Sequence, residues 1–484
     1  MGEAMEFVRK NKIILLILVL ALGLRLIIIN QSLWLDESIG ALAVRDFSYS
    51  EIISKLLVVD NHSPLYYLML KFWSDIWGYS EFALRSLSVL FSLISIYFTY
   101  KTTQLLTKSR YVWYFSAIFL SVSQFYIYYS QEARMYMPAA AFSVMSVYYF
   151  LQILKKSQII YWLLFSFSIT ALIFTDYVPV FILPAFFIVA LVLGKSREWW
   201  VKYFCTFIPL ILLGILWLPI FTQQLHNSPY TLKVSPNWRD VAGGANFKQA
   251  ALLIIKFTSG RISFVNKQLY YLFALFAIIP YAYTQIKNSS YKKILPIYVF
   301  SIVPIVGLFI ASIFFPGFIY FRLTYVYPFF AIVVSYALFH RKRNYFLAIV
   351  LLAVNIFSLG TYYIDTHQQR EQWKQAVSYI ESTAKNDSLT LFRYPKPFSP
   401  YRWYNNGTIE AEGAFLAVNA HTDGTQEHIE SLIKDSTTLY TFDYLKEISD
   451  TDNLLDEVLE KNGFKIVSEN ANFVGIGKIT TWQR

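Results

Sequence analysis

The sequence predicts an α-helical polytopic membrane protein that ends in a small α/β domain. Of the 484 residues, 56% are hydrophobic and 19% are aromatic, and the mean hydropathy is +0.42. Soluble domains are usually about 45–50% apolar. The apolar residues also gather in long runs, and a helix needs about 20 residues to cross the hydrocarbon core of a bilayer. The composition changes only near residue 366, where mixed polar and apolar sequence begins.

Charge is distributed unequally along the chain. Residues 1–369 carry 30 lysines and arginines against 14 acidic residues, whereas residues 370–484 carry 12 against 17. The net charge of +11 therefore belongs to the apolar part, where basic residues in short loops set the membrane topology. This distribution argues against a nucleic-acid partner. Cys205 is the single cysteine, which excludes a disulfide framework and a cysteine metal cluster.

The apolar runs predict about eleven transmembrane helices. The first lacks a small-residue cleavage site, so we expect it to be retained. Basic residues recur in every second connection, for example at Lys155 and Lys156, which predicts a cytoplasmic N-terminus and an outward-facing first loop, residues 31–85. Lys287, Arg341 and Lys342 support the same topology. The runs lie near residues 12–30, 83–101, 111–128, 136–154, 159–175, 177–194, 201–220, 268–286, 294–315, 319–340 and 344–364.

The first outward loop is rich in ionisable residues and begins with Asp36 and Glu37. Neighbours on a helix point about 100° apart, so the two carboxylates are not expected to act as one dyad. One would act on a substrate while the other orients a partner, or both simply begin a water-facing helix. Short helices are expected at 36–45, after the capping-box pattern Ser48–Glu51, and at 66–77 along the interface.

Asp60 and His62 lie close together in the same loop, just before Pro64. They would orient a phosphate or a sugar hydroxyl, or they would form only a polar turn fixed by the proline. A divalent metal would need a third ligand, such as an acid from elsewhere, and the spacing is not specific for one. The sequence therefore leaves metal and cofactor dependence open.

Three arginines lie at the outer ends of predicted spans and are candidate ligands for a lipid phosphate: Arg85, Arg134 and Arg322. A guanidinium at this depth is costly without an anion. Glu132, beside Arg134, is a further candidate substrate-binding residue. The alternatives are an Arg85 pair with Glu81, a Glu132–Arg134 interface pair, and an Arg322 side chain that snorkels to the interface.

Residues 366–484 alternate between helical and strand-like patterns, which predicts a small soluble α/β domain after a membrane domain of residues 1–365. Eleven spans would place this domain outside the cytoplasm. Helices are expected at 371–382, 426–434 and 452–461, and strands at 389–392, 438–442, 464–467 and 473–476.

The order of these motifs resembles the GT-C-type membrane glycosyltransferases. The motifs are Leu-Asp-Glu at 35–37, Asp-Asn-His-Ser-Pro-Leu-Tyr-Tyr at 60–67, Ser-Glu-Phe-Ala-Leu-Arg at 80–85 and Gln-Glu-Ala-Arg-Met-Tyr at 131–136. The likeness covers roughly residues 10–370 and points to the branch of protein O-mannosyltransferases, the lipid A aminoarabinose transferase and RgtA/B/C/D-like enzymes. Two positions depart from the family pattern: Ser63 stands where a proline is common, and Asp176 stands where many relatives carry histidine.

The resemblance implies transfer of a sugar from a polyprenyl-phosphate donor to a hydroxyl of a glycolipid, polysaccharide or protein acceptor. It implies a bacterial or archaeal plasma membrane, with membrane lipids around the spans and the active site on the non-cytoplasmic face. Asp36 matches the proposed catalytic base and Glu37 its neighbour, while Arg85 and Arg134 match cations near the donor phosphate. One base without a second carboxylate nucleophile would give inversion. The alternatives are a lipid or glycan transporter or flippase, and a receptor that binds a partner through the C-terminal domain.

Overall fold

The computed structural model describes residues 2–234, 242–286, 291–340, 343–385, 387–418, 420 and 422–484, so Lys287, Arg341 and Lys342 lie outside the described residues. The chain forms two compact units. The membrane unit comprises Met1–Ile29, Tyr49–Gln224 and Ala242–Ile364, and the C-terminal unit comprises Asn30–Ser48, Leu225–Val241 and Asp365–Arg484. The start of the first outward loop, with Asp36 and Glu37, thus belongs to the C-terminal unit, and the rest of that loop belongs to the membrane unit.

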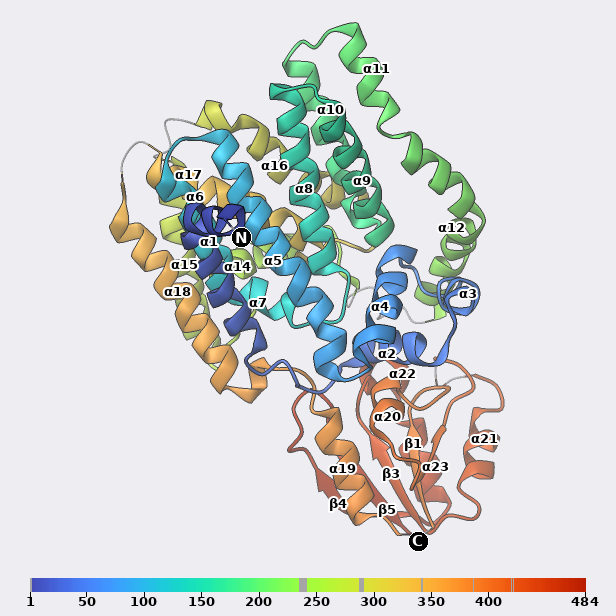
Figure 1. The fold of residues 1–484 in the computed structure, drawn as a ribbon. Coiled ribbons are helices and arrows are strands. Elements are labelled where there is room, and N and C mark those ends of the chain that lie inside the picture. The colour runs from blue at the N-terminus through green and yellow to red at the C-terminus, as the bar shows by residue number, and fades with distance from the viewer. Residues whose placement is uncertain are drawn as a thin grey trace. The chain divides into compact units, whose positions relative to one another are not determined.

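The membrane unit is entirely helical in the described residues (Figure 1). Its first half contains α1 (Gly2–Leu26), α3 (Tyr49–Glu51), η1 (Ile52–Leu56), α4 (Pro64–Trp77), α5 (Glu81–Leu106), α6 (Arg110–Val122), α7 (Gln124–Ser130), α8 (Tyr136–Lys155), α9 (Ile159–Thr175), η2 (Val178–Ile182) and α10 (Leu183–Val192). Its second half contains α11 (Arg197–Cys205), α14 (Phe247–Ser259), α15 (Lys267–Ile286), η3 (Tyr291–Ile294), α16 (Leu295–Ala311), η4 (Tyr320–Val326), α17 (Tyr327–Phe339) and α18 (Tyr345–Ile364). It also contains the part of α12 (Ile208–Val234) up to Gln224.

Within the described residues, seven helical segments are long and apolar enough to cross a membrane, against the eleven expected from the apolar runs. Two further apolar segments, Ile159–Thr175 and Val178–Val192, are shorter. The expected span 111–128 is broken at Ser123, whose hydroxyl accepts a hydrogen bond from the Tyr126 amide and begins α7. A hydropathy run counts apolar residues but does not register such a break. The predicted fold class, a polytopic helical protein with a small C-terminal sheet domain, is confirmed.

Helices α5, α8 and α9 pack side by side at the centre of this unit (Figure 1). Small residues on these helices are fully buried, such as Ser88 and Ser92 of α5 and Ala140 of α8, and small residues allow close approach of helix backbones. Burial differs sharply between spans: the α8 window is 78% buried, whereas that of Arg197–Asn227 is 6% buried. The latter helix therefore presents almost its whole apolar surface outward, as a lipid-facing helix does.

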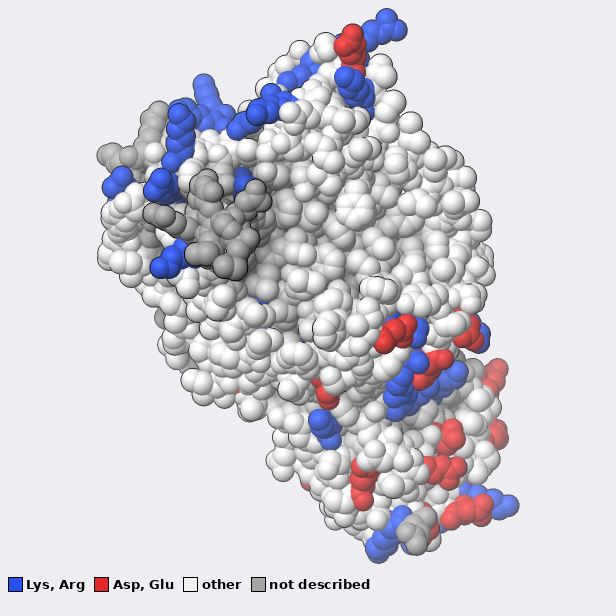
Figure 2. Space-filling view, viewed as in Figure 1, with Lys and Arg blue, Asp and Glu red and all other residues white. Residues whose placement is uncertain are grey.

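Charged side chains are concentrated at the ends of the membrane unit. Figure 2 shows lysines and arginines at the end near α11, followed by a broad face without charged residues. Such a belt matches the surface of a membrane protein that contacts lipid.

The C-terminal unit is built on a five-stranded sheet of order β2-β1-β3-β5-β4 (Figure 1). β1 pairs in parallel with β2 and β3, whereas β5 runs antiparallel to β3 and β4. The strands are β1 (Ser388–Phe392), β2 (Glu410–Gly413), β3 (Thr438–Phe442), β4 (Lys465–Asn470) and β5 (Ile479–Gln483). The helices are α2 (Leu35–Asp46), η5 (Thr366–Gln368), α19 (Trp373–Thr383), α20 (Ser399–Tyr404), α21 (Thr425–Leu432), α22 (Lys446–Ser449) and α23 (Leu454–Lys461).

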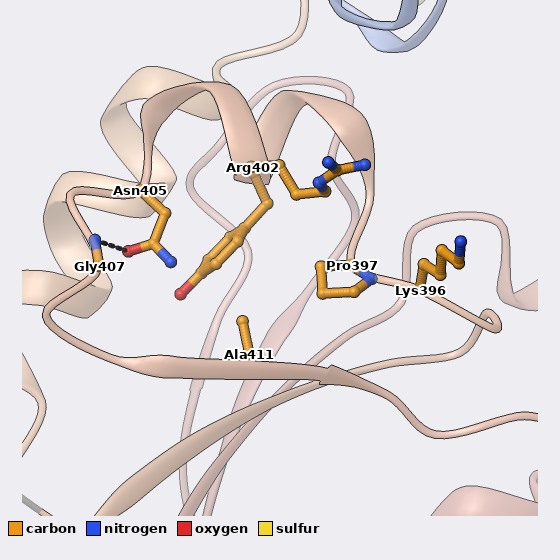
Figure 3. A pocket seen from close by; sticks show the side chains of 7 residues that line it. Lys396, Pro397, Arg402, Asn405, Gly407 and Ala411 are labelled. Carbon is orange, nitrogen blue, oxygen red and sulfur yellow. Dashed lines mark hydrogen bonds between the residues drawn. The ribbon is translucent and has the colours of Figure 1, made fainter. Parts of the chain in front are cut away.

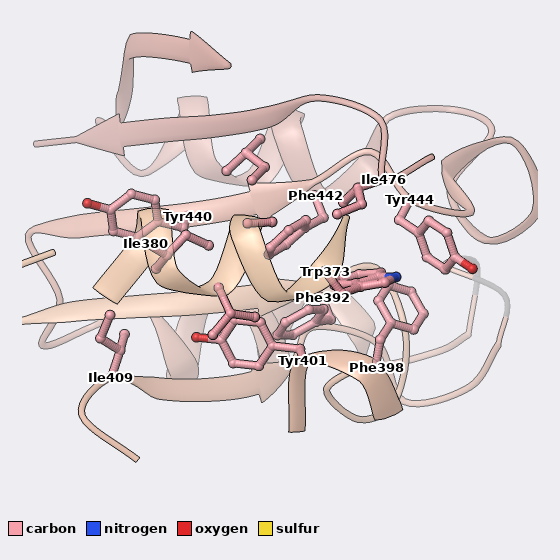
Figure 4. Packing of buried hydrophobic residues seen from close by; sticks show 13 residues of the cluster. Trp373, Ile380, Phe392, Phe398, Tyr401, Ile409, Tyr440, Phe442, Tyr444 and Ile476 are labelled. Atoms are coloured by element: carbon pink, nitrogen blue, oxygen red, sulfur yellow. The ribbon is translucent and has the colours of Figure 1, made fainter. Parts of the chain in front are cut away.

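Each face of the sheet carries its own apolar core. On one face, Trp373 and Ile380 of α19 pack with Phe392 and Phe442 of the strands (Figure 4). On the other face, α21 and α23 cover the alternate strand residues, including Leu439. The expected strand 473–476 is a turn. β2 and β5 are short strands with mixed sequence, and the sequence pattern did not predict them.

Candidate active site

The loop that carries Asp60 and His62 is held in place from two sides. The Ser63 hydroxyl donates to the Ile173 carbonyl at 2.9 Å, and Pro64 begins α4 at the position where a proline fits a helix start. From α12, the Gln224 side-chain amide donates to the carbonyls of Asp60 and His62 at 2.9 and 3.1 Å. The loop is therefore fixed to α9 and α12 by hydrogen bonds between side chains and backbone carbonyls.

Asp60, His62 and Arg134 meet in one hydrogen-bonded network that also includes Tyr67 of α4. The His62 Nδ1 atom forms a hydrogen bond with the Asp60 carboxylate, and the Tyr67 hydroxyl donates to the same carboxylate at 2.8 Å. Arg134 lies 3.1 Å from the Tyr67 hydroxyl and 2.9 Å from His62 Nε2. Because a guanidinium has only donors, Nε2 accepts from Arg134, and the imidazole proton lies on Nδ1 towards Asp60.

The network keeps Asp60 ionised. Burial alone would raise the pKa of Asp60, but His62, Arg134 and the Tyr67 hydroxyl lower this pKa to about 2. The carboxylate in turn orients His62, which orients Arg134. The guanidinium of Arg134, only 4% exposed, is thus fixed in position before any substrate arrives.

Asp176 and Arg322 lie near this network. Burial raises the pKa of Asp176, although the Val178 amide, His62 and the guanidinium groups of Arg322 and Arg134 oppose the rise. The Arg322 guanidinium makes a long contact of 3.4 Å with the Gly317 carbonyl. His62, Arg134 and Arg322 of the membrane unit therefore all lie within electrostatic reach of Asp176, the residue that stands where many relatives carry histidine.

Arg85 and Glu132 are fully enclosed. Arg85 donates to the Ile29 carbonyl at 2.6 Å and so supports the chain just after α1. Arg261 lies within electrostatic reach of Glu132, although the sequence did not indicate it as a site residue. The Arg261 guanidinium stacks 4.1 Å from the centre of the Tyr128 ring, and nothing in the spacing of the sequence connects the two.

Asp36 and Glu37 lie in the first turn of α2, in the C-terminal unit. Glu37 is fully buried and accepts a long hydrogen bond of 3.5 Å from the Trp34 amide, which fits a role at the helix start. Asp36 is partly exposed, and its charge is felt by Glu371 of the same unit. The two neighbouring carboxylates thus lie in different environments, with Glu37 buried and Asp36 partly exposed.

No group of three or more histidine, cysteine, aspartate or glutamate residues within the described ranges is arranged to hold a metal ion. A surface cleft of about 410 Å³ lies in the C-terminal unit, between α20 and β2. Figure 3 shows that Arg402 and Lys396 line it, with Asn405 accepting a hydrogen bond from the Gly407 amide at 3.1 Å. None of the predicted site residues lines this cleft.

Comparison with protein families finds a match for part of the chain. Residues 61–222, about a third of the chain, match the family model described as dolichyl-phosphate-mannose-protein mannosyltransferase. No curated protein sequence matches the chain.

Solved structures share its fold at 10% sequence identity. The structure of ArnT from Cupriavidus metallidurans bound to undecaprenyl phosphate gives a TM-score of 0.55 and covers 97% of this chain and 98% of that one. The apo oligosaccharyltransferase of Archaeoglobus fulgidus gives 0.52 and covers 90% and 70%. The resemblance seen in the sequence is thereby confirmed: about a third of the chain matches the mannosyltransferase family model, and the chain shares its fold with ArnT and with the oligosaccharyltransferase.

Proposed function

We propose that this protein transfers a sugar from a polyprenyl-phosphate donor to an acceptor hydroxyl on the non-cytoplasmic face of the membrane. The observation that carries the proposal is the fixed guanidinium of Arg134, held by His62 and Tyr67 in a unit of apolar helices, with Arg322 acting on the same neighbour, Asp176. Planar guanidinium groups bind phosphate with two parallel hydrogen bonds. The ArnT structure with undecaprenyl phosphate supports a lipid phosphate as the ligand class.

In the proposed reaction, Asp36 takes the proton of the acceptor hydroxyl while the new bond forms at the anomeric carbon. The bond between that carbon and the phosphate oxygen breaks, and the negative charge moves to the polyprenyl phosphate. A positioned base contributes about 10²–10⁴-fold. Arg134 and Arg322, with Arg85 as a further candidate, would stabilise the charge that grows on the leaving phosphate. Direct displacement inverts the anomeric configuration.

The other candidates take supporting roles in this proposal. Asp60 and His62 hold Arg134, Glu37 fixes the start of α2, and Glu132 neutralises Arg261. A glycolipid, a polysaccharide or a protein remains the class of acceptor.

The test is an Asp36→Asn variant expressed in the native host or in one that lacks the gene. Mass spectrometry of lipid-linked sugars and surface glycans, with and without the protein, identifies donor and product. We expect Asp36→Asn to abolish transfer at normal membrane levels. Asp46→Asn is the matched control, because Asp46 lies at the exposed end of the same helix and pairs with Arg45. Transfer retained by Asp36→Asn removes Asp36 from the mechanism.

Sidedness is tested separately with single cysteines in a Cys205→Ser background. Lys55 and Lys156 are exposed and lie at opposite predicted faces. A membrane-impermeant maleimide added to intact cells should label Lys55→Cys and leave Lys156→Cys unlabelled. The reverse pattern would contradict an extracytoplasmic site.

A further inference from the structure

Glu371 occupies a closed setting at the beginning of the C-terminal domain. Its carboxylate accepts a hydrogen bond from Trp373 Nε1 at 2.7 Å and one from the Tyr444 hydroxyl at 3.0 Å. The Trp373 and Tyr444 rings pack edge to face, with centres 5.1 Å apart. Gly475 closes the setting: a Cβ there would lie 2.8 Å from the Glu371 Cγ, and its φ of +79° also favours glycine. The surroundings are therefore shaped to hold this carboxyl group.

The carboxyl group of Glu371 lies within electrostatic reach of Asp36. Burial is the main cause that raises the pKa of Glu371 to about 7, and the negative charge of Asp36 adds to it. The hydrogen bonds from Trp373 and Tyr444 and the charge of Arg370 act in the opposite direction. Asp36 also raises the pKa of Tyr444, after burial and the contact of Tyr444 with Glu371. The two segments also contact each other directly: the Arg370 amide donates to the Gln31 side chain at 2.8 Å, and the Lys374 amide donates to the Ser32 hydroxyl at 3.1 Å. Leu35, next to Asp36, packs against the apolar cluster that contains Trp373 and Tyr444. Two carboxyl groups from distant parts of the sequence thus share one environment within the C-terminal unit.

We propose that Glu371 is a positioning residue for the transfer reaction and that it sets the charge beside the base Asp36. This inference rests on the proposed function, in which Asp36 takes the acceptor proton. A protonated Glu371 leaves Asp36 as the one negative charge of the pair. When Glu371 releases its proton to water, a second negative charge appears beside Asp36 and strengthens it as a proton acceptor. Glu371 thereby acts on the chemistry through Asp36, without itself touching the substrate.

The first experiment compares the pH profile of transfer in the wild type and in Glu371→Gln between pH 5.5 and 8.5. The wild type should show a rise of about three- to tenfold centred near pH 7, because a stronger base transfers the proton faster. Glu371→Gln should lack this step. Glu427→Gln, an exposed glutamate on α21, is the control and should keep it. A step that persists in Glu371→Gln overturns the proposal.

A second variant distinguishes an electrostatic role from a structural one. Tyr444→Phe removes a hydrogen bond that favours the ionised form of Glu371, so the step should move to higher pH rather than disappear. A variant that only loosens the fold would lower transfer at every pH and leave the midpoint in place. That result also counts against the proposal.

Infrared titration of the carboxyl C=O band gives a readout that does not depend on transfer. The full-length protein in lipid nanodiscs should show a protonated carboxyl that titrates near pH 7, and Glu371→Gln should remove it. Asp36→Asn should move this titration to lower pH, because the neighbouring negative charge is gone. If these shifts appear but Asp36→Asn retains transfer, the proposed function fails while the pairing stands. If Asp36→Asn leaves the titration unchanged, the pairing itself is wrong.

Discussion

Asp60 in the membrane unit and Glu371 in the C-terminal unit are both enclosed carboxyl groups, yet their pKa values shift in opposite directions. Burial acts on both in the same direction, raising the pKa. Around Asp60, the partners are His62 and Arg134, and the pKa falls to about 2. Around Glu371, the charged neighbours include another carboxylate, Asp36, and the pKa rises to about 7.

The contrast shows that cationic and hydrogen-bonding partners outweigh burial at Asp60, whereas burial prevails at Glu371 and Asp36 adds to it. In the membrane unit, a permanent carboxylate can anchor a guanidinium for a phosphate. In the C-terminal unit, a carboxyl that gains and loses its proton near neutral pH can modulate a base. Each arrangement suits a different part of one transfer reaction, in which charge grows on the leaving phosphate and a proton leaves the acceptor.

The largest expected effect tests whether charge pairing also dominates in the C-terminal unit when a cation is present. Arg393, 1% exposed, pairs with Asp450 and lies 2.6 Å from Asp456. Arg393→Met leaves the buried Asp450 without this cation and should lower the free energy of unfolding by about 3–5 kcal/mol. Chemical unfolding of the full-length protein in detergent measures the change. Arg402→Met, at an exposed position, should change it by less than about 0.5 kcal/mol. A stable Arg393→Met would show that pairing matters little here.

Arg134→Gln tests the membrane-unit half of the comparison. It removes the guanidinium that contacts His62 and Tyr67, and transfer should fall by about 10²–10³-fold if Arg134 stabilises the leaving phosphate. The rate of transfer at saturating donor is the measurement. Arg110→Gln, at an exposed helix start, is the matched control. An unchanged rate would show that the Asp60 network serves the fold alone.

The sequence predicted Asp60, His62 and Arg134 as separate candidates, because each is a polar residue in an otherwise apolar region. It could not show that they form one network, since Arg134, in the turn between α7 and α8, reaches His62 across 72 residues of sequence. Tyr67 stood in the recognised motif, yet its hydroxyl as the link between Asp60 and Arg134 emerges only from the geometry.

The C-terminal unit shows the opposite limit. Strand-like and helix-like runs correctly placed β1, β3 and three helices, and both strands are buried along their whole length. Glu371 gave no signal: it is one of many acidic residues in a soluble domain. Only the contacts with Trp373, Tyr444 and Gly475 and the influence of Asp36 distinguish it.

Asp60→Asn tests the sign of the effect on stability. The pKa of Asp60 is lower in the folded state, so its ionised form stabilises the fold above about pH 4, and this contribution is lost as the pH falls towards 2. The variant should therefore be less stable than the wild type by about 1–2 kcal/mol at pH 7, and the gap should shrink at pH 3. Melting temperatures in detergent at the two pH values measure it.

Glu371→Gln provides the counterpart with the opposite sign. The pKa of Glu371 is higher in the folded state, so the wild type loses stability as the pH rises from about 4.5 to 7. The glutamine variant should match the wild type at pH 5 and exceed it at pH 8. If both variants changed stability in the same direction with pH, the comparison between the two carboxyl groups would fail.

The smallest expected effect concerns Tyr67, whose hydroxyl donates to Asp60 and lies next to Arg134. Tyr67→Phe removes the hydroxyl but keeps the ring, so Asp60 and His62 still face Arg134. Losing one such hydrogen bond costs about 1 kcal/mol, which corresponds to about a fivefold lower rate if it loosens Arg134. Tyr271→Phe, exposed on α15, should leave the rate unchanged. A loss in Tyr67→Phe as large as in Arg134→Gln would show that the hydroxyl, rather than the carboxylate–imidazole pair, holds the guanidinium in place.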